Sequence, residues 1–321
     1  MVEGIINIAK KYGIDLSEEE AKEVLKEIKR WFKPSVEIKG EVVKTYDGSF
    51  TRFSEEYGEP YHSITAGAVK ECYGKFLLPS RLLFKAKFLK RIFILDIGFG
   101  LGYNTAVAIY YLKLLNRSLD ILIYSFDKYI PFHIPFLPEP YASIHRMIVK
   151  GLPCFEKDGI YFRYFQGDAR KTLKFINDNL YFDVIFHDPF SPFRNPEMWT
   201  LDFFKLLKEK LKLGGTWVSY TSSLCVRKAL YLLNLSVKES IPLGRKRKGT
   251  VAIKYTENYT DENIKKRLKE SPYAIPLRDE DLKSDPFDIL VRYFSEVIKL
   301  KTKEGRHENF PFTYKVHNII N

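Results

Sequence analysis

Five continuous apolar runs of strand length alternate with helical patterns in the middle of the chain. The runs cover residues 91–97, 121–126, 160–165, 183–187 and 216–221. Between several of them, apolar residues recur at helical spacing over 103–115, 170–177 and 202–212. Unbroken apolar runs are typical of strands buried on both faces, and strands that alternate with helices form parallel sheets. The sequence therefore predicts an α/β fold built on a mostly parallel sheet.

The region after this alternation has a different pattern. Residues 235–241 and 251–255 resemble two strands joined by a short basic segment, and we expect them to close the sheet as an antiparallel pair. Helical patterns follow over 261–269 and 286–300, and then a polar tail.

A helical pattern also precedes the sheet region. Apolar residues recur at helical spacing over 15–33, and Pro34 should end that helix. Residues 41–60 resemble short strands with an Asp-Gly hairpin signal at 47–48, and 64–90 are helical in character. We therefore expect four segments: a helical extension (1–40), a small β/helical segment (41–90), a Rossmann-like fold (91–260) and a C-terminal extension (261–321).

The charge balance favours a polyanionic partner. Apolar residues make up 45% and charged residues 29% of the 321, which is ordinary for a globular protein, but the net charge is +12. Such an excess favours nucleic acid, with a lysine-rich solvated surface as the alternative. No run approaches the ~18 apolar residues that span a bilayer, and the N-terminus lacks the pattern of a secretion signal. The three cysteines lie far apart, so we expect no metal site and a reducing, cytoplasmic location.

A glycine cluster, Asp-Ile-Gly-Phe-Gly-Leu-Gly over 96–102, follows one predicted strand and opens a helix. Glycines let the backbone approach a ligand closely, and a helix N-terminus favours an anion. A dinucleotide fingerprint requires G-x-G-x-x-G, whereas Tyr103 occupies the place of the third glycine here. The acid two residues before the first glycine, Asp96, makes the loop typical of S-adenosylmethionine sites. A tight strand-to-helix turn without a ligand is the alternative.

Two further acids follow the next predicted strands. Asp127 ends 121–126, where an acid can accept both ribose hydroxyls of a nucleoside, and Asp168 follows 160–165, where it could accept an adenine amino group. A helix N-cap is the alternative for Asp168. Because the carboxyl ends of parallel strands meet at one sheet edge, three acids in these places favour a nucleoside site.

The segment after the fourth strand carries the reaction chemistry. Asp188-Pro189-Phe190 resembles the Asp-Pro-Pro-Tyr/Phe motif of amino methyltransferases. A nitrogen nucleophile must be held so that its lone pair points at the methyl group, which a carboxylate and neighbouring carbonyls can do. Pro189 would stiffen the loop and Phe190 would stack on a base. We interpret His187 as a packed strand residue and Trp199 as a buried anchor.

Four consecutive cations, Arg245, Lys246, Arg247 and Lys248, connect the last two predicted strands. We interpret them as a phosphate clamp, because they belong to the same fold as the expected site. The alternative is an exposed turn whose charges are simply solvated.

Together these motifs resemble the family of tRNA wobble-uridine 5-aminomethyl-2-thiouridine methyltransferases. The resemblance spans about residues 45–255, and its most specific stretch is Asn-Pro-Glu-Met-Trp at 195–199. The other resembling segments are 58–63, 67–71, 95–104, 125–128, 167–169, 187–192, 221–227 and 244–247, with 271–279 further downstream. Asp127 departs from the family, which often has Glu there, and residues 1–40 have no counterpart that we can place.

The resemblance implies a Rossmann-like methyltransferase of the stand-alone form, without the fused flavin oxidase. It would use S-adenosylmethionine to methylate the exocyclic amine of 5-aminomethyl(-2-thio)uridine in the anticodon region of tRNA, on substrate supplied by upstream tRNA-modifying enzymes. No FAD, metal or membrane would take part. The implied cofactor-binding residues are Asp96, Gly98, Phe99, Gly100, Gly102, Asn104, Asp127, Lys128, Asp168 and Ala169. Asp188 would face the reacting amine, and the implied substrate-binding residues are Pro189, Phe190, Arg245, Lys246, Arg247 and Lys248.

Two other functions stay open on the sequence alone. An aminopropyltransferase of the spermidine-synthase kind shares a similar glycine loop and acid pattern, but it needs an acidic polyamine site, which the net charge of +12 disfavours. A non-enzymatic RNA-binding protein with a relic fold would explain the charge without the chemistry.

Overall fold

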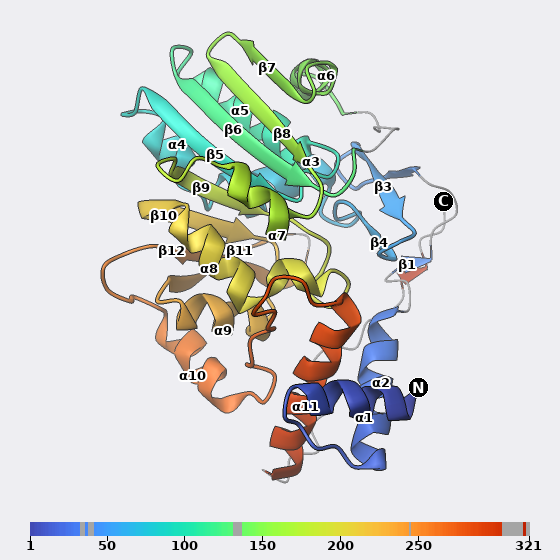
Figure 1. Cartoon of the computed structure of the whole chain (residues 1–321). Helices are drawn as coiled ribbons and strands as arrows, with labels where there is room; N and C mark the ends of the chain where they lie inside the picture. The colour runs from blue at the N-terminus through green and yellow to red at the C-terminus, as the bar shows by residue number, and fades with distance from the viewer. Residues whose placement is uncertain (33–35, 38–41, 131–136, 244, 304–316, 319–321) are drawn as a thin grey trace.

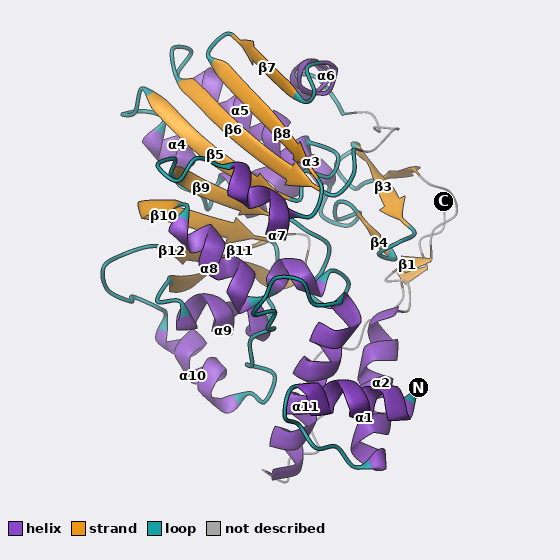
Figure 2. Ribbon diagram, viewed as in Figure 1, coloured by secondary structure: helices purple, strands orange, loops and turns teal. Residues whose placement is uncertain are grey.

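A central eight-stranded sheet organises the chain in the computed structural model (Figures 1 and 2). The structure describes residues 1–32, 36–37, 42–130, 137–243, 245–303 and 317–318. The strand order is β11-β12-β10-β9-β5-β6-β8-β7. The strands are β5 (Arg91–Ile97), β6 (Asp120–Asp127), β7 (Cys154–Lys157), β8 (Ile160–Gln166), β9 (Phe182–His187), β10 (Leu211–Ser219), β11 (Ser236–Leu243) and β12 (Arg245–Ile253). Every apolar run that predicted a buried strand is therefore a strand of this sheet.

The middle of the sheet is parallel, as the sequence predicts. Strands β10, β9, β5, β6 and β8 run in one direction, with Ile94 of β5 opposite Val184 of β9 on one side and Ile123 of β6 on the other. Strand β12 pairs antiparallel with both β10 and β11, so the predicted antiparallel closing pair is confirmed. Strand β7, which the sequence reading missed, adds an antiparallel strand at the opposite edge.

Helices cover both faces of the sheet and enclose two apolar cores. One face carries α3 (Ala68–Glu71), the π-helix η1 (Cys72–Leu77), α4 (Leu82–Lys85), α5 (Tyr103–Leu115) and α6 (Tyr141–Lys150). The other face carries α7 (Ala169–Thr172), α8 (Leu201–Glu209), α9 (Leu224–Leu232) and α10 (Glu262–Glu270). Because helices cover both faces of the sheet, the side chains on both faces of its central strands are buried, and these strands appear in the sequence as continuous apolar runs.

A small second sheet lies beside the carboxyl ends of the parallel strands (Figure 1). It consists of β2 (Val42–Lys44), β3 (Phe50–Ser54) and β4 (Glu59–Pro60). Strands β2 and β3 pair antiparallel around the predicted Asp-Gly turn, where the Asp47 carboxylate accepts hydrogen bonds from the Thr45 hydroxyl at 2.9 Å and the Ser49 hydroxyl at 2.6 Å. The two residues of β1 (Val36–Glu37) pair in parallel with β13 (His317–Asn318).

Helices from the two ends of the chain pack together. Helices α1 (Val2–Lys11) and α2 (Glu18–Phe32) contact α11 (Pro286–Lys303), as Figure 1 shows in blue and red. A capping box starts α2: the Glu20 amide donates to the Ser17 hydroxyl at 3.2 Å, and the Ser17 amide donates to the Glu20 carboxylate at 2.8 Å. The sequence predicts α2 but not α1, and Pro34 lies outside the described residues.

Three local predictions need correction. The helix expected over 202–212 ends at Glu209, because β10 already begins at Leu211. The helix expected over 170–177 is the single turn α7 followed by the 3-10 turn η2 (Leu173–Phe175). The cations at 245–248, which were expected to connect the last two strands, belong to strand β12, because their backbone pairs with β11.

The four-segment division of the chain stays a prediction. In the part of the chain that the structure describes, none of the helices is long and apolar enough to cross a membrane.

Candidate functional site

A cavity of about 460 Å³ opens where the parallel strands β5, β6, β8 and β9 reach their carboxyl ends. The loops that follow these strands line it together with the β3–β4 turn and helix α2. Of the residues proposed from the sequence, Gly98, Gly100, Asp127, Lys128, Asp168, Ala169, Asp188, Pro189 and Phe190 line this cavity. Sheet topology explains the convergence, because parallel strands bring loops that are distant in sequence to one edge.

Gly98 is required by its backbone and its surroundings. Its φ angle is +83°, a conformation that L side chains rarely adopt, and an added Cβ would lie 2.7 Å from the carbonyl carbon and oxygen of Asp188. The Gly98 amide donates to the Phe126 carbonyl at 2.9 Å. The glycine loop and the loop after β9 therefore touch backbone to backbone, and together they form one wall of the cavity.

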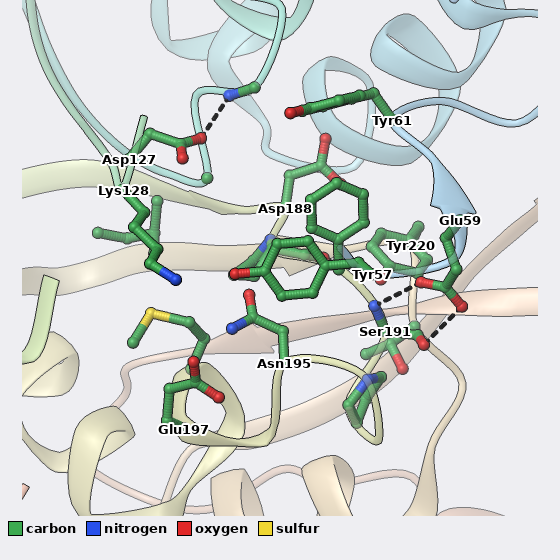
Figure 3. Close-up of a pocket in the computed structure, with 18 of the residues that line it drawn as sticks. Tyr57, Glu59, Tyr61, Asp127, Lys128, Asp188, Ser191, Asn195, Glu197 and Tyr220 are labelled. Atoms are coloured by element: carbon green, nitrogen blue, oxygen red, sulfur yellow. Dashed lines mark hydrogen bonds between the residues drawn. The ribbon is translucent and has the colours of Figure 1, made fainter. Parts of the chain in front are cut away.

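Asp127 connects β6 to the glycine loop. Its carboxylate accepts a hydrogen bond from the Gly100 amide at 2.7 Å, and burial raises the pKa of this carboxyl. Its neighbour Lys128 forms an ion pair at 2.9 Å with Glu56 of the β3–β4 turn, and both residues line the cavity. Figure 3 shows Asp127 and Lys128 together on one side of the cavity.

Asp188 lies beside Asn104, which the sequence analysis assigned to the cofactor. The Asn104 side-chain amide donates to the Asp188 carboxylate at 2.7 Å, and the Asp188 backbone amide donates to the Ile97 carbonyl at 2.8 Å. Burial raises the pKa of Asp188 well above its ordinary value, the negative charge of Glu71 raises it further, and the Asn104 hydrogen bond lowers it. Asp188 is thus a fixed carboxylate that binds a proton more tightly than an exposed aspartate.

Aromatic rings surround Phe190 in the loop after β9. Tyr57 stacks on its ring at 4.2 Å with an interplanar angle of 15°, and Tyr61 meets it edge-on at 5.0 Å. Burial raises the pKa of Tyr61 to about 12. Figure 3 shows the rings of Tyr57 and Tyr61 near Asp188.

The loop after β9 is held at several points. The Tyr220 hydroxyl donates to the Pro189 carbonyl at 2.9 Å, and the Trp199 indole donates to the Phe190 carbonyl at 2.7 Å. Buried Glu59 accepts hydrogen bonds from the Ser191 amide at 3.0 Å and the Ser191 hydroxyl at 2.7 Å (Figure 3). These contacts fix the backbone of the loop that carries Asp188 and Phe190.

Helix α2 reaches the same loop. The ring of Trp31 lies 4.6 Å from that of Phe193, which also packs against Tyr293 and Phe294 of α11. Trp31 lines the cavity as well. The N-terminal extension therefore forms part of the wall of the site.

Four residues proposed for the cofactor lie behind the cavity wall. Asp96 is fully buried and accepts from the hydroxyls of Thr105 at 2.9 Å and Ser125 at 3.1 Å, and burial raises its pKa to about 7. Phe99 is buried, with its ring against Gly102. Asn104 does not line the cavity, and its side chain is hydrogen-bonded to Asp188. The structure gives these residues supporting positions, and their contact with a cofactor stays a prediction.

Lys248, the last cation of the basic segment, does not line the cavity either. The Lys248 ammonium lies 3.3 Å from the Glu239 carboxylate of β11. The side chains of Arg245, Lys246 and Arg247 are outside the described part of the structure, so their part in binding phosphate stays a prediction.

His187 and Trp199 are packed side chains, as the sequence analysis interprets them. Both are 0% exposed, and their rings meet edge-on at 4.6 Å. Burial lowers the pKa of His187 to about 3, so its imidazole is neutral. Within the described residues no group of three or more His, Cys, Asp or Glu side chains is arranged to hold a metal ion.

Sequence reasoning missed several residues of the site, namely Tyr57, Glu59, Glu71, Glu197 and Tyr220. Glu59 and Glu71 fall inside segments that carry the family resemblance, and Glu197 is the acid of the Asn-Pro-Glu-Met-Trp stretch. That stretch could have drawn attention to Glu197, because it is the most specific part of the resemblance and Glu197 is its only acid. Tyr57 and Tyr220 gave no such signal.

Comparison with known proteins places these features in a family. A family described as S-adenosyl-L-methionine-dependent methyltransferase matches residues 145–255. The uncharacterized protein MJ0670 of Methanocaldococcus jannaschii is 32% identical over 253 residues, which are 75% of this chain and 68% of that protein.

The bifunctional protein MnmC of Actinobacillus pleuropneumoniae, named for tRNA 5-methylaminomethyl-2-thiouridine biosynthesis, is 29% identical over 231 residues. The match covers 63% of this chain but 33% of that protein, so the chain spans about a third of the length of this relative.

A solved structure gives an extensive match. The chain in the crystal structure of MnmC2 from Aquifex aeolicus is 47% identical in sequence to this chain. The two structures match with a TM-score of 0.83, over 90% of this chain and 95% of that one. The cavity at the strand ends, with its glycine loop and its Asp-Pro-Phe segment, lies within a fold that the two proteins share. The chain belongs to the family of S-adenosylmethionine-dependent methyltransferases that includes MnmC2.

Proposed function

We propose that this protein uses S-adenosylmethionine to methylate the exocyclic amine of 5-aminomethyl(-2-thio)uridine at the wobble position of tRNA. The family membership supports the methyl transfer, and the names of its MnmC relatives support the substrate. The observation that carries the proposal for this chain is the Asp188 carboxylate, fixed by Asn104 at 2.7 Å in the wall of a cavity that also contains the glycine loop.

The cavity residues fit the proposed cofactor. Gly98 forms a cradle that a Cβ would fill, and the Asp127 carboxylate stands at the end of β6, where a ribose is expected. The cofactor supplies an electrophilic methyl group on a sulfonium. Gly98 and Gly100 would hold its methionine end, Asp127 its ribose, and Asp168 with Ala169 the surroundings of its adenine.

We assign the orientation of the amine to Asp188. An alkyl amine has a pKa near that of lysine, about 10.4, and must lose a proton before it attacks. The apolar rings and prolines after β9 would lower that pKa by desolvation, whereas a carboxylate alone would raise it. The role of Asp188 is therefore to point the lone pair at the methyl group, with proton acceptance as its second role.

Phe190 would contact the flipped base, and Pro189 would shape the loop beside it. The rings of Tyr57 and Tyr61, which contact Phe190, complete an aromatic surface suited to a pyrimidine. The net charge of +12 and the four cations at the start of β12 would bind the anticodon backbone. Since the substrate is a modified tRNA, upstream modifying enzymes must supply it, and we expect the reaction in the cytoplasm.

The comparisons favour this function over the two alternatives. Both the aminopropyltransferase and the RNA-binding protein without activity would have to be members of a methyltransferase family. We further propose that the chain acts without FAD or a metal, because its glycine loop is committed to one cofactor and no other G-x-G occurs in the sequence.

The test uses two tRNAs with the full-length protein. One carries 5-aminomethyl-uridine and the other the 5-carboxymethylaminomethyl form, and each is incubated with radiolabelled methyl donor alone. We expect label in the first tRNA and none in the second. Label in neither tRNA would refute the proposed function, and label in the second would refute the substrate assignment or the absence of an oxidase.

A further inference from the structure

The residue expected to bind the cofactor's adenine, Asp168, already has partners for both of its oxygens. Its Oδ1 accepts hydrogen bonds from the Arg170 backbone amide at 3.0 Å and the Arg170 Nε at 3.1 Å, and its Oδ2 accepts from an Arg170 terminal nitrogen at 2.9 Å. Asp168 is thereby the N-cap of α7, which was the alternative reading of this residue. An acid held in this way has little capacity left for a ligand.

Arg170 is itself fixed by the C-terminal part of the chain. It donates to the fully buried Asp279 carboxylate at 2.8 Å and to the Ser284 carbonyl at 3.1 Å. The Asp279 carboxylate also accepts from the Ser284 amide at 2.9 Å. The Asp168–Arg170 pair is therefore part of a structural network that ties the C-terminal extension to the cavity, and releasing Asp168 from it would leave Arg170 partly unpaired.

A second acid on the same side of the cavity has an unused oxygen. Glu197 lines the cavity together with Asp168, Ala169, Arg170 and Met198. Its Oε2 is buried and has no hydrogen-bond partner among the described residues. Figure 3 shows Glu197 next to Asn195, below Lys128.

An unpartnered buried carboxyl oxygen is costly, because its lost hydration is not replaced. In a binding cavity, a bound ligand can donate the hydrogen bond that such an oxygen lacks in the protein alone. The ionised carboxylate of Glu197 has only acceptors, so it can bind an amino group but offers no donor to an oxo group.

We propose that Glu197, rather than Asp168, accepts the hydrogen bond from the amino group of the cofactor's adenine. Met198 provides the apolar surface beside it, and Asp168 is a positioning residue that holds α7 through Arg170. This inference rests on the proposed use of S-adenosylmethionine, but not on the tRNA substrate.

The test compares two product-like ligands by isothermal titration calorimetry with full-length protein. S-adenosylhomocysteine carries the amino group, and S-inosylhomocysteine carries an oxo group, whose lone pairs would face Glu197. We expect wild-type protein to prefer the adenosine form by roughly tenfold or more. In Glu197→Gln the side-chain amide can turn its NH₂ toward the oxo group, so the preference should fall to near unity.

Two further variants separate this inference from its competitors. Asp168→Asn should weaken both ligands alike and keep the preference, because it acts through Arg170. Glu156→Gln, on the exposed surface of β7, is the matched control and should change neither affinity. A preference that survives in Glu197→Gln, or that disappears in Asp168→Asn, would overturn the assignment. If wild-type protein binds neither ligand, the proposed cofactor itself is wrong.

Discussion

Replacing Asp188 by Asn should abolish nearly all turnover while making the protein more stable. The two side chains have almost the same shape, and an asparagine at this position can still accept the hydrogen bond that Asn104 donates at 2.7 Å. What is lost is the negative charge that orients the amine and takes up its proton. A positioned acid–base group contributes roughly 10²–10⁴-fold to a rate, or about 2.7–5.4 kcal/mol of transition-state stabilisation.

The stability change follows from the pKa of Asp188. Because burial raises this pKa in the folded state, the folded protein binds the proton more tightly than the unfolded chain does. The charged carboxylate therefore destabilises the fold as the pH rises above about 4, the unfolded value, and this cost is absent below it. Asp188→Asn removes the cost, so its melting temperature should exceed that of the wild type at neutral pH and the two should converge in acid.

Two measurements check this reasoning. Single-turnover methylation assays give the rate, and calorimetric melting from pH 4 to 8 gives the stability. Asn104→Ala is the companion variant: it should lose roughly 10–150-fold in rate, which corresponds to one hydrogen bond to a charged group at about 1.5–3 kcal/mol. Activity of Asp188→Asn within threefold of the wild type would remove Asp188 from the mechanism, and a lower melting temperature at neutral pH would refute the electrostatic argument.

Three further predictions concern the cofactor loop, the RNA and the acceptor. Gly98→Ala should abolish cofactor binding by calorimetry, since its Cβ would lie 2.7 Å from the Asp188 carbonyl, whereas Gly48→Ala, with a similar φ of +85° and nothing within 4 Å, should cost stability alone, about 1–2 kcal/mol. Replacing Arg245, Lys246, Arg247 and Lys248 by Ala should weaken tRNA binding and reduce its log–log salt slope by about 0.7–0.9 for each lost phosphate contact; an unchanged slope would show that these cations are ordinary solvated charges. Trp31→Ala should raise the KM for tRNA, because this ring backs Phe193 beside the cavity; unchanged kinetics would make the N-terminal extension a purely structural element.

Much of the sheet follows from local sequence pattern. Helix α5 has the predicted bounds, 103–115, and each buried strand coincides with an apolar run, because burial on both faces leaves a continuous signal. Strand β7 leaves none, since it is short and three of its four residues are exposed. The end of α8 was misplaced because β10 begins two residues after it, and the apolar pattern does not separate the two elements.

The acids at the strand ends were predictable for a similar reason: their positions depend on sheet topology, which the sequence pattern indicates. Their partners were not. Glu59 and Ser191 are 132 residues apart in the sequence, and Arg170 and Asp279 are 109 apart. Local sequence periodicity cannot predict contacts between residues that are so distant. The same holds for the ion pair that joins Lys128 to Glu56. The sequence therefore indicated where the chemistry lies, but not which oxygens are already occupied.

The most direct test of the account is to find where the methyl group goes. The full-length protein is incubated with tRNA carrying 5-aminomethyl-uridine and a deuteriomethyl-labelled donor, and the digested nucleosides are analysed by mass spectrometry. We predict one labelled methyl group on the exocyclic amine of the wobble uridine, with Asp188→Asn giving almost none. Label on a ribose, on another base, or at equal levels in wild type and Asp188→Asn would contradict the account.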